Sequence, residues 1–420
     1  MKEIVAMILA GGKTTSGFGV LALNRAKAAL PFLGRYRLID FTLSNLSNSN
    51  IERVGIITQY LPASLMGHIG VGSSWDLDGF GRTAKIMPPF IGINNTEWYL
   101  GTADAIYRNL NFIEEWNPKL VLVLAGDHIY TMDYRHLISY HIEKQADLTI
   151  VYKRINPKPS DTQFGYLNVD ENHRITNFVE KPSNPTSDII SLGIYLFNRD
   201  ILEQALEEDA KSPTYHNISA DIVAKLVREK IVYGYEFKEF WEYLKDINEY
   251  FDVHMQFLND ENIFDLEKAG IRTNLYDRNT GFRPPIFISP EAVVEKSIIA
   301  LGCKVFGKVS QSVLSPGVII EEGAEVIDSI IMHDCTVKKE AKIKRVVSDK
   351  DSIFDEGSEI NFQDTSNLIP PQELIPNTII TTIGKNVKIG KNSKIHAGCQ
   401  IYPNKTINEG SEIPNFSVIK

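Results

Sequence analysis

The C-terminal third of the chain carries an isoleucine at every sixth position. The residues that keep this spacing are Ile383, Ile389, Ile395, Ile401, Ile407, Ile413 and Ile419. An α-helix would repeat its apolar side chains every three or four residues, and a β-strand would repeat them every two. A period of six is typical of short strands stacked around a narrow axis, each turning one aliphatic side chain inward. The pattern therefore predicts a left-handed hexapeptide-repeat β-helix, with a generic β-sandwich as the less favoured alternative.

The same period appears upstream, with slips between blocks. The aliphatic residues that keep it are Ile288 and Val294, Ile299 and Val305, Leu314, Ile320 and Val326, and Ile331, Val337 and Ile343. The β-helix is therefore predicted to span residues 286–420. Residues 367–376 are rich in proline, which cannot donate a ladder hydrogen bond. We expect a loop near residues 362–378 that interrupts the repeat.

Residues 1–258 follow a different pattern, in which apolar runs alternate with amphipathic segments. The runs within residues 4–10, 52–58 and 119–125 predict strands covered on both faces, which are typical of parallel sheets. Residues 102–110 have the spacing of a helix. This alternation predicts a doubly wound, mostly parallel α/β domain with ligands at the carboxyl ends of its strands. Residues 259–285 would link this domain to the β-helix.

Composition narrows the range of partners and compartments. The chain has 420 residues, 43% of them hydrophobic, and a net charge of -9 without a run of lysine or arginine, so it is a poor candidate for nucleic-acid binding. The apolar start at residues 4–10 is too short to span a membrane. Cys303, Cys335 and Cys399 lack the spacing of a metal site. We expect them to be buried thiols of the β-helix in a reducing cytoplasm.

Three short segments contain residues that are suited to chemistry. Gly11 and Gly12 follow the first predicted strand, where such a loop either closes backbone N–H groups on a phosphate or forms a simple tight turn. Asp127 follows another predicted strand, where a carboxylate either holds a divalent cation or caps the next helix. Glu180 and Lys181, taken alone, indicate only a solvated charge pair before a turn.

At these places the chain resembles the sugar-nucleotide pyrophosphorylases, and most specifically the ADP-glucose pyrophosphorylase family. The motifs that carry the resemblance are Gly11-Gly12, Arg25-Ala26-Lys27, Tyr36-Arg37-Leu38-Ile39-Asp40-Phe41, Ile57-Thr58-Gln59-Tyr60, Glu97-Trp98-Tyr99-Leu100-Gly101-Thr102-Ala103-Asp104-Ala105 and Ala125-Gly126-Asp127-His128-Ile129-Tyr130. The resemblance covers nearly the whole chain, because this family joins such an α/β domain to a hexapeptide β-helix. It implies a reaction of bacterial glycogen synthesis, in which the phosphate of glucose 1-phosphate attacks the α-phosphorus of ATP. The products are ADP-glucose and pyrophosphate, and Mg²⁺ is required.

The resemblance also implies roles for individual residues. Lys27 matches a catalytic lysine at the triphosphate, and Asp127 matches a catalytic metal ligand. The residues that match the nucleotide-binding side are Gly11, Gly12, Gln59, Trp98, Gly101 and Thr102. The residues that match the sugar-phosphate side are Glu180, Lys181 and Gly193.

Several positions depart from the family pattern, and they concern charge. The family's first loop carries an arginine that clamps phosphates, whereas this chain has Thr14, Thr15 and Ser16 there. The second Mg²⁺ ligand of the family is an aspartate, and Tyr243 occupies that position here. Residues 215–221 lack one carboxylate and one lysine of the family pattern. Losing a metal ligand together with a phosphate-binding arginine should cost at least ~10³-fold in rate.

These departures favour a catalytically impaired regulatory subunit, which resembles the family's D-type chains that assemble with a catalytic paralogue. The alternative is an active adenylyltransferase in which Glu242 or Asp246 replaces the lost metal ligand. That replacement would require the strand to slip by one residue, which turns each side chain to the other face. A third hypothesis is a CoA-dependent acyltransferase that uses His333 or His396 of the β-helix as its base.

Regulation and assembly are expected from the resemblance alone. The family is activated by sugar phosphates that bind between its domains, and it forms tetramers. Arg37, Arg53 and Lys85 are candidates for the effector site only because they are basic and N-terminal. Whether the chain assembles with itself or with a paralogue is left open by the sequence.

Overall fold

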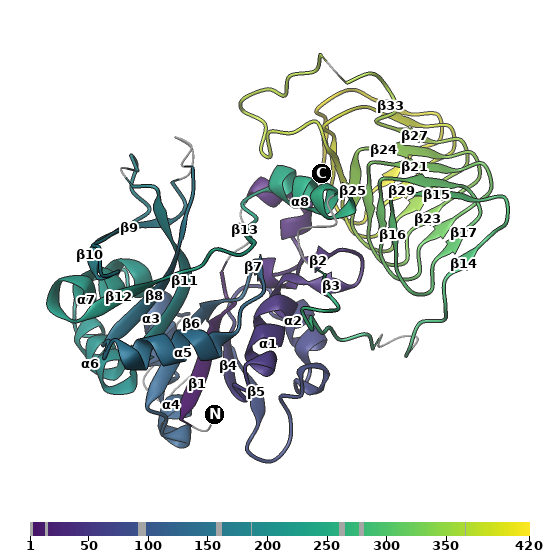
Figure 1. Cartoon of the computed structure of the whole chain (residues 1–420). Coiled ribbons are helices and arrows are strands. Elements are labelled where there is room, and N and C mark those ends of the chain that lie inside the picture. The colour runs from purple at the N-terminus through teal and green to yellow at the C-terminus, as the bar shows by residue number, and fades with distance from the viewer. Residues whose placement is uncertain are drawn as a thin grey trace. The chain divides into compact units, whose positions relative to one another are not determined.

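The computed structural model describes residues 3–12, 16–90, 98–156, 162–185, 187–259, 265–276, 281–365 and 367–420. The chain forms two compact units (Figure 1). The first unit consists of Met1–Lys13, Ile39–Glu242 and Ala269–Arg272, and the second of Thr14–Leu38, Tyr243–Lys268 and Thr273–Lys420. One N-terminal segment and one segment that precedes the β-helix therefore cluster with the C-terminal third. The domain boundaries given above stay a prediction.

A nine-stranded mixed sheet forms the centre of the first unit. Its strands are β1 (Ile4–Leu9), β4 (Arg53–Ile57), β5 (Thr83–Met87), β6 (Leu120–Ala125), β8 (Leu148–Arg154), β9 (Gly165–Val169), β10 (Ile175–Glu180), β11 (Ile189–Asn198) and β12 (Val232–Glu236). The order is β10-β9-β11-β6-β1-β4-β5, and β8 joins β11 to β12. Strands β6, β1, β4 and β5 are parallel, as predicted for a doubly wound sheet. The other half is largely antiparallel, because β11 runs against β6, β8 and β9.

Short helices cover this sheet. They are α1 (Leu38–Asn48), α2 (Ala63–Ile69), η3 (Ser73–Trp75), α3 (Thr102–Tyr107), α4 (Leu110–Trp116), α5 (Tyr134–Glu143), α6 (Arg199–Asp209), η4 (Ile218–Val223) and α7 (Ala224–Glu229), and the short strand β7 (His128–Tyr130) follows β6. Ile106 of α3 and Leu202 of α6 pack with Val123 of the sheet in one buried cluster. Burial of each such side chain contributes about 1.5–3 kcal/mol. Among the helices that the structure describes, none is long and apolar enough to cross a membrane.

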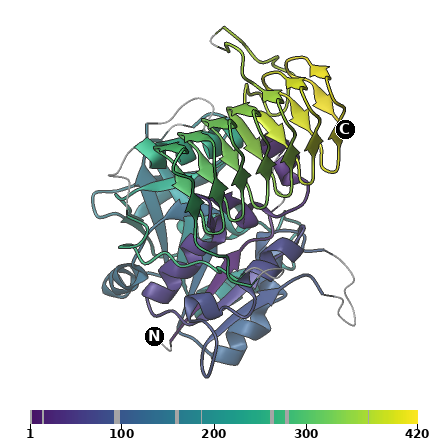
Figure 2. The same ribbon diagram turned by 90° about the vertical axis from the view of Figure 1, so that its right-hand side faces the viewer.

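Three seven-stranded parallel sheets form the β-helix of the second unit (Figure 2). The first contains β14 (Phe287–Ile288), β17 (Lys304–Val305), β20 (Ile319–Ile320), β23 (Thr336–Val337), β26 (Ile353–Phe354), β29 (Lys388–Ile389) and β32 (Thr406–Ile407). The second contains β15 (Val293–Glu295), β18 (Lys308–Ser310), β21 (Glu325–Ile327), β24 (Lys342–Lys344), β27 (Glu359–Ile360), β30 (Lys394–Ile395) and β33 (Glu412–Ile413). The third contains β16 (Ile298–Ile299), β19 (Val313–Leu314), β22 (Ile330–Ile331), β25 (Val346–Ser348), β28 (Thr381–Ile383), β31 (Gln400–Ile401) and β34 (Val418–Ile419).

The predicted six-residue repeat is confirmed, and its aliphatic residues fill the axis of the β-helix. Ile383 and Ile401 are fully buried and stand in register on neighbouring coils. Ile413 and Ile419 are only partly buried, because they belong to the last coils. The three cysteines are buried free thiols, as expected. The described residues between β27 and β28 contain no strand, and the proline-rich loop near residues 362–378 stays a prediction.

The remaining elements of the second unit come from two earlier segments, Thr14–Leu38 and Tyr243–Lys268. They are η1 (Ser16–Ala22), η2 (Lys27–Ala29), β2 (Pro31–Phe32), β3 (Tyr36–Arg37) and α8 (Ile247–Asn259), which follows the short strand β13 (Trp241–Tyr243). Helix α8 begins with a capping arrangement in which Asp246 Oδ1 accepts from the N–H of Glu249 at 3.1 Å. Glu249 Oε2 in turn accepts from the N–H of Lys245 at 2.7 Å. Such reciprocal bonds satisfy backbone donors that a helix start leaves open.

Candidate functional site

The predicted site residues are divided between the two units. Lys27 and Tyr243 belong to the second unit, and the other predicted residues belong to the first. In the second unit, Lys27 begins η2 and is buried, with 5% of its surface exposed. Its ammonium Nζ lies 3.4 Å from the centroid of the Tyr243 ring. The lysine that the resemblance assigns to the triphosphate is therefore covered by the ring of Tyr243, which stands at the predicted position of the second metal ligand.

Glu242 and Asp246, the two residues considered as replacements for the lost metal ligand, are placed differently in the structure. Asp246 caps α8, because its Oδ1 accepts from the backbone N–H of Asn248 at 2.9 Å and of Glu249 at 3.1 Å. A Cβ added to Gly17 would lie 2.8 Å from the Cβ of Asp246. The N-terminal segment therefore packs closely against Asp246. Glu242 alternates with Tyr243 along β13, so the two side chains leave opposite faces of the strand. Neither carboxylate takes the position that Tyr243 holds.

In the first unit, Asp127 lies two residues after the end of β6, next to the start of β7, in agreement with a position beyond the end of a buried strand. Asp127 Oδ1 lies 3.6 Å from Nε2 of His128, which is itself packed edge-on against the Trp241 ring at 5.1 Å. Gly193 sits in an irregular part of β11 with a φ of +64°, and a Cβ there would lie 3.5 Å from His128 Cε1. The predicted sugar-side glycine and the predicted metal ligand are therefore neighbours in this unit.

Glu180 and Lys181 stand at the end of β10. Glu180 is largely buried, whereas Lys181 is 59% exposed, and their charged atoms are 3.7 Å apart. Burial raises the pKa of the Glu180 carboxyl, although Lys181 opposes the shift. Burial and the nearby Glu180 raise the pKa of Tyr195 to about 12. The phenol of Tyr195 therefore stays protonated and accepts from the Ser191 hydroxyl at 3.1 Å. A buried acceptor beside an exposed cation suits a ligand that carries both hydroxyls and a phosphate.

The predicted nucleotide-binding residues start from the ends of β1 and β4. A Cβ on Gly11 would come within 2.9 Å of the Gln59 backbone nitrogen, so Gly11 is required by close packing. Gly12 has open space at that position among the described residues. Gln59 Nε2 donates to the Tyr99 carbonyl at 3.3 Å. The loop residues Thr14 and Thr15, where the family arginine is missing, lie outside the described residues.

An aromatic pair stands beside these residues. The ring of Trp98 is nearly parallel to that of Tyr60, with an interplanar angle of 9° and centroids 5.9 Å apart. Trp98 is 61% exposed, and Tyr60 is 43% exposed. Exposed flat rings of this kind offer a stacking surface to a nucleotide base. Sequence reasoning named Trp98 and missed the contribution of Tyr60, although Tyr60 directly follows Gln59.

Gly101 and Thr102 start α3 under tight packing. A Cβ on Gly101 would meet the carbonyl oxygens of Tyr215 and His216 at 2.3 Å, so only glycine fits. Thr102 Oγ1 accepts from the N–H of Ile218 at 2.9 Å. These contacts join the start of α3 to the segment in which the family's lysine and carboxylate are absent. The segment therefore holds the start of α3 in place.

The donor set limits what metal this chain can bind. Within the described residues there is no group of three or more aspartate, glutamate, histidine or cysteine side chains placed to hold a metal ion. Mg²⁺ needs only one or two carboxylates when substrate phosphates supply the other ligands. Asp127 provides one such carboxylate, and Tyr243 provides none. The donors among the described residues therefore fit Mg²⁺ whose other ligands are the phosphates of a nucleotide.

The three candidate effector residues belong to different units. Arg53 lies over the Trp116 ring at 4.3 Å, and Lys85 Nζ lies 3.8 Å from a carboxylate oxygen of Glu115. Both are surface contacts of the first unit. Arg37 belongs instead to the second unit, where it acts electrostatically on Lys350. Burial lowers the pKa of Lys350 to about 7, and Arg37 and Arg25 add to the shift.

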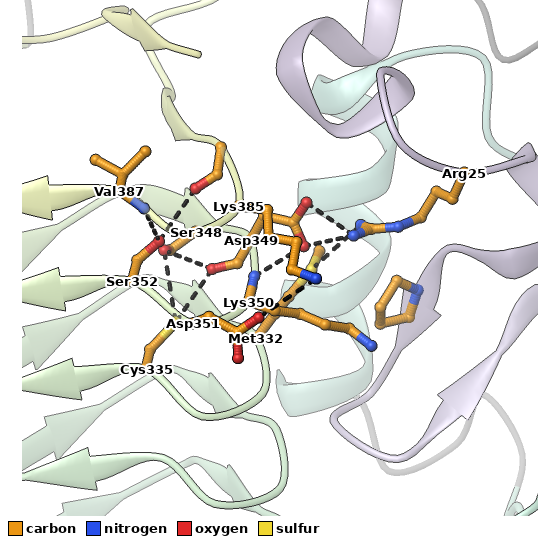
Figure 3. Close-up of polar contacts among 12 residues, drawn as sticks. Arg25, Met332, Cys335, Ser348, Asp349, Lys350, Asp351, Ser352, Lys385 and Val387 are labelled. Atoms are coloured by element: carbon orange, nitrogen blue, oxygen red, sulfur yellow. Dashed lines mark hydrogen bonds and ion pairs between the residues drawn. The ribbon is translucent and has the colours of Figure 1, made fainter. Parts of the chain in front are cut away.

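A buried ion pair in this region was missed by sequence reasoning. Arg25 Nη2 lies 2.6 Å and 2.7 Å from the two carboxylate oxygens of Asp349, and both residues are almost completely buried (Figure 3). The two residues are 324 positions apart, so no local pattern joins them. The only signal was the charged run Asp349-Lys350-Asp351 inside an otherwise hexad-repeating segment.

Neither histidine proposed for an acyltransferase is placed as a general base, because His396 is engaged in other contacts and Nδ1 of His333 is buried without a hydrogen-bond partner among the described residues. His396 Nδ1 bonds with Gln363 Oε1 at 2.6 Å, and its Nε2 lies 3.0 Å from Glu412 Oε1. Burial and four nearby cations, Lys350 among them, hold the pKa of His333 well below its usual range. These surroundings give neither histidine the exposed, unengaged nitrogen that a general base needs.

Comparisons with known proteins identify the family. The nucleotidyl transferase family matches residues 5–260, and the GlmU-like C-terminal hexapeptide family matches residues 289–367. The chain is 39% identical over 386 residues to proteins named glucose-1-phosphate adenylyltransferase from Bacillus cereus (strain ATCC 10987 / NRS 248), Bacillus mycoides (strain KBAB4) and Bacillus anthracis. Each match covers 91% of this chain and 99% of the relative. The chain therefore belongs to the glucose-1-phosphate adenylyltransferase family of nucleotidyl transferases.

Proposed function

We propose that this chain is a catalytically impaired regulatory subunit that assembles with a catalytic paralogue of the same family. The observation that carries the proposal is the Tyr243 ring, which lies 3.4 Å from the Lys27 ammonium. An aromatic ring cannot supply the anionic oxygen that a second Mg²⁺ ligand requires. It also competes with a triphosphate for the lysine, because a cation–π contact is worth about 0.5–2 kcal/mol.

The positions assigned to ligand binding keep the residues of the family pattern better than the positions assigned to charge stabilisation in the reaction. Glu180, Lys181 and Gly193 keep the sugar-phosphate positions of the family, and Gly193 packs against the residues beside Asp127. The exposed Trp98 ring keeps a stacking surface on the nucleotide side. A chain that binds sugar phosphates and nucleotides without turning them over is suited to sensing them for a partner.

Effector control is part of this proposal. We expect sugar-phosphate effectors to bind near Arg37, because Arg25 and Lys350 provide two further cations in the same region. Strong positive potential favours a ligand with one or more phosphate groups. Arg53 and Lys85 are less suited, since each is occupied in a separate surface contact.

Assembly and compartment complete the proposal. We propose a tetramer of this chain with its paralogue, as the family resemblance implies, located in the cytoplasm. Three buried thiols that form no disulfide are compatible with a reducing compartment. The pathway that the resemblance implies is bacterial glycogen synthesis, with ATP and glucose 1-phosphate as the substrates of the partner.

The alternative is an active adenylyltransferase that makes ADP-glucose and pyrophosphate from ATP and glucose 1-phosphate. It is favoured by the presence of Lys27 and Asp127 and by the names of the relatives. It is weakened by Asp246, which caps α8, and by Glu242, which leaves the other face of β13. In that case Lys27 would neutralise the triphosphate, and Asp127 would orient the Mg²⁺ that supplies further charge neutralisation.

Purified chain, assayed alone for ADP-glucose formation with Mg²⁺, tests the proposal. We expect turnover far below the ordinary enzyme range of roughly 1–10³ s⁻¹. Tyr243→Asp should raise the rate at least ~10-fold, because it restores a carboxylate and uncovers Lys27. Tyr243→Phe is the matched control, since it keeps the ring and should leave the rate unchanged. A wild-type rate within the ordinary range would establish the alternative.

A further inference from the structure

The second sheet of the β-helix carries a charged side chain at the same register position of successive coils. The residues that pair with one another in this register are, in chain order, Lys308, Glu325, Lys342, Glu359, Lys394 and Glu412. In Figure 1 the labelled strands of this sheet, β15, β21, β24, β27 and β33, lie on one side of the β-helix. Neighbouring strands are about 4.7–4.9 Å apart, so the sign of the charge changes at every such step.

The turns that lead from the first sheet into the second repeat this alternation. Their charged residues are Glu322, Lys339, Glu356, Lys391 and Glu409. They are stacked, because the N–H of the residue after each one donates to the carbonyl of its counterpart in the preceding coil. Each has the same sign as the sheet residue three positions later, so a coil presents one sign and the next coil presents the other. The two rows together form the striped face of the second unit.

Contacts within the chain use these charges only in part. Lys391 Nζ lies 2.7 Å from Glu356 Oε2, whereas Lys342 Nζ lies 4.0 Å from Glu325 Oε1. The side chains of Lys391 and Glu356 are 47% and 53% exposed. Exposed pairs of this kind add little to stability. Ordered charges on a surface do, however, determine which partner and which register are compatible with it.

A second copy of the striped face is complementary to the first in the antiparallel orientation. With the two β-helices parallel and in register, every coil would face a coil of its own sign. With the β-helices antiparallel and the two-fold axis between β24 and β27, every coil of the sheet row faces a coil of the opposite sign. Lys342 then faces Glu359 of the other copy, and this pair occurs twice, as an isologous interface requires. The outer pairs are Glu325 with Lys394 and Lys308 with Glu412, each formed twice.

We propose that the striped face binds the same face of a second copy of this chain in this antiparallel register. Opposite charges attract at each coil, and the parallel arrangement in register is excluded because like charges would meet. The attraction is between exposed groups and therefore weakens as salt screens it. This inference deepens the assembly proposed above by naming the face at which two copies of this chain meet. It does not depend on whether the chain turns over its substrates.

Sedimentation velocity of the full chain, without a paralogue, tests the proposal at about 0.05 M and about 1 M NaCl. At the lower salt concentration, Lys342→Glu and Glu359→Lys should each lower the weight-average mass about two-fold, because each puts like charges together on both sides of the two-fold axis. The first substitution lowers the net charge and the second raises it, so a change in net charge cannot explain both losses. Wild type should show the same loss at the higher salt concentration.

An equal mixture of the two single variants should recover the wild-type mass. In the mixed pair the introduced glutamate faces the introduced lysine, and the unchanged Lys342 faces the unchanged Glu359. Recovery also shows that both variants are folded. The double variant Lys342→Glu/Glu359→Lys should recover the mass as well, although it puts like charges beside Glu325 and Lys394 of its own chain. A role confined to contacts within the chain predicts no recovery in either case.

Lys304→Glu is the matched control. Lys304 is exposed on β17 of the first sheet, so the same change of charge is made on another face. We expect the mass to stay that of wild type. A wild-type chain that is monomeric at the lower salt concentration, or that associates only with a paralogue, would overturn the proposal, as would single variants that associate normally or a mixture that does not recover. None of these measurements records ADP-glucose formation, so a failure here is distinguishable from a failure of the proposed loss of turnover.

Discussion

The residues predicted to bind the sugar phosphate, in the first unit, and the lysine predicted to bind the triphosphate, in the second unit, have different surroundings. In the first unit, Glu180 and Lys181 stand together, and Gly193 keeps the space beside His128 clear. In the second unit, Lys27 is present but lies under the Tyr243 ring. Recognition of a ligand needs shape and a few hydrogen bonds, whereas phosphoryl chemistry needs uncovered charge. This difference is the basis for proposing that the chain binds its ligands with little turnover.

The same segment of the second unit contains a parallel case. Arg25 is two residues before Lys27, and it is covered by the Asp349 carboxylate. An aromatic ring weakens a cation's hold on a phosphate without neutralising it, whereas a carboxylate is itself an anion that another anion can displace. Substitutions around the two neighbouring cations, Arg25 and Lys27, should therefore have different effects.

The largest effect is expected from Asp349→Ala. It leaves the buried Arg25 without its carboxylate and should lower the free energy of unfolding of the second unit by about 3–5 kcal/mol. Asp351→Ala is the control and should cost less than about 1 kcal/mol, because its pair with Lys385 is half-exposed. Denaturant titration followed by hydrogen exchange in the β-helix measures both. Equal losses in the two variants would show that the Arg25 pair is not special.

Acid should weaken the second unit through His254. This residue is buried, accepts from the N–H of Leu33 at 3.1 Å and donates to the Tyr250 carbonyl at 2.7 Å. Burial lowers its pKa to about 4 from 6.5. Above pH 6.5 the histidine is neutral in both states, so its full contribution is present. As the pH falls from 6.5 to 4, the unfolded state binds more protons, and about 3 kcal/mol of stability is lost.

His254→Gln is the test of this pH dependence. The glutamine does not titrate, so the free energy of unfolding should become flatter between pH 6.5 and 4. In the first unit, burial also lowers the pKa of His141, which gives a loss in the same direction and serves as an internal reference. An unchanged slope in His254→Gln would assign the acid sensitivity to other groups.

Ligand binding should separate Lys181 from Lys27. Lys181→Gln removes a charge-assisted contact to the phosphate and should weaken glucose 1-phosphate binding by ~10-fold or more. Lys27→Gln should change that affinity less than ~3-fold, since the lysine is already covered by Tyr243. Calorimetric titration of the two variants measures both values. A larger loss in Lys27→Gln would mean that this lysine leaves the ring when the sugar phosphate binds.

The smallest expected effect concerns the Tyr243 ring itself. Tyr243→Leu keeps an apolar side chain and removes the aromatic face, so it should lower the free energy of unfolding by about 0.5–2 kcal/mol. Tyr243→Phe should be nearly neutral. A double-mutant cycle with Lys27→Met isolates the pair, and a coupling energy near zero would remove the cation–π contact from the argument.

Local sequence determined the regular parts of this protein. The six-residue spacing predicted the β-helix and the burial of Ile383 and Ile401, because each coil repeats one short-range pattern. Apolar runs predicted β1, β4 and β6 for the same reason. The predicted helix at residues 102–110 divides into α3 and the start of α4, and the antiparallel half of the sheet was not foreseen. Strand direction depends on the connections between strands, which local spacing does not encode.

Tertiary structure alone decided what the charged residues do. The resemblance predicted that Tyr243 stands at the position of a carboxylate, but only folding put its ring over Lys27, which lies 216 positions earlier in the chain. The sequence left open a role for Asp246 as a metal ligand, whereas in the structure its carboxylate caps α8. The partner of Arg25 is contributed by a coil of the β-helix 324 positions away. Apolar side chains are placed by spacing along the chain, whereas the energy of a charge depends on which distant groups folding brings within a few ångströms.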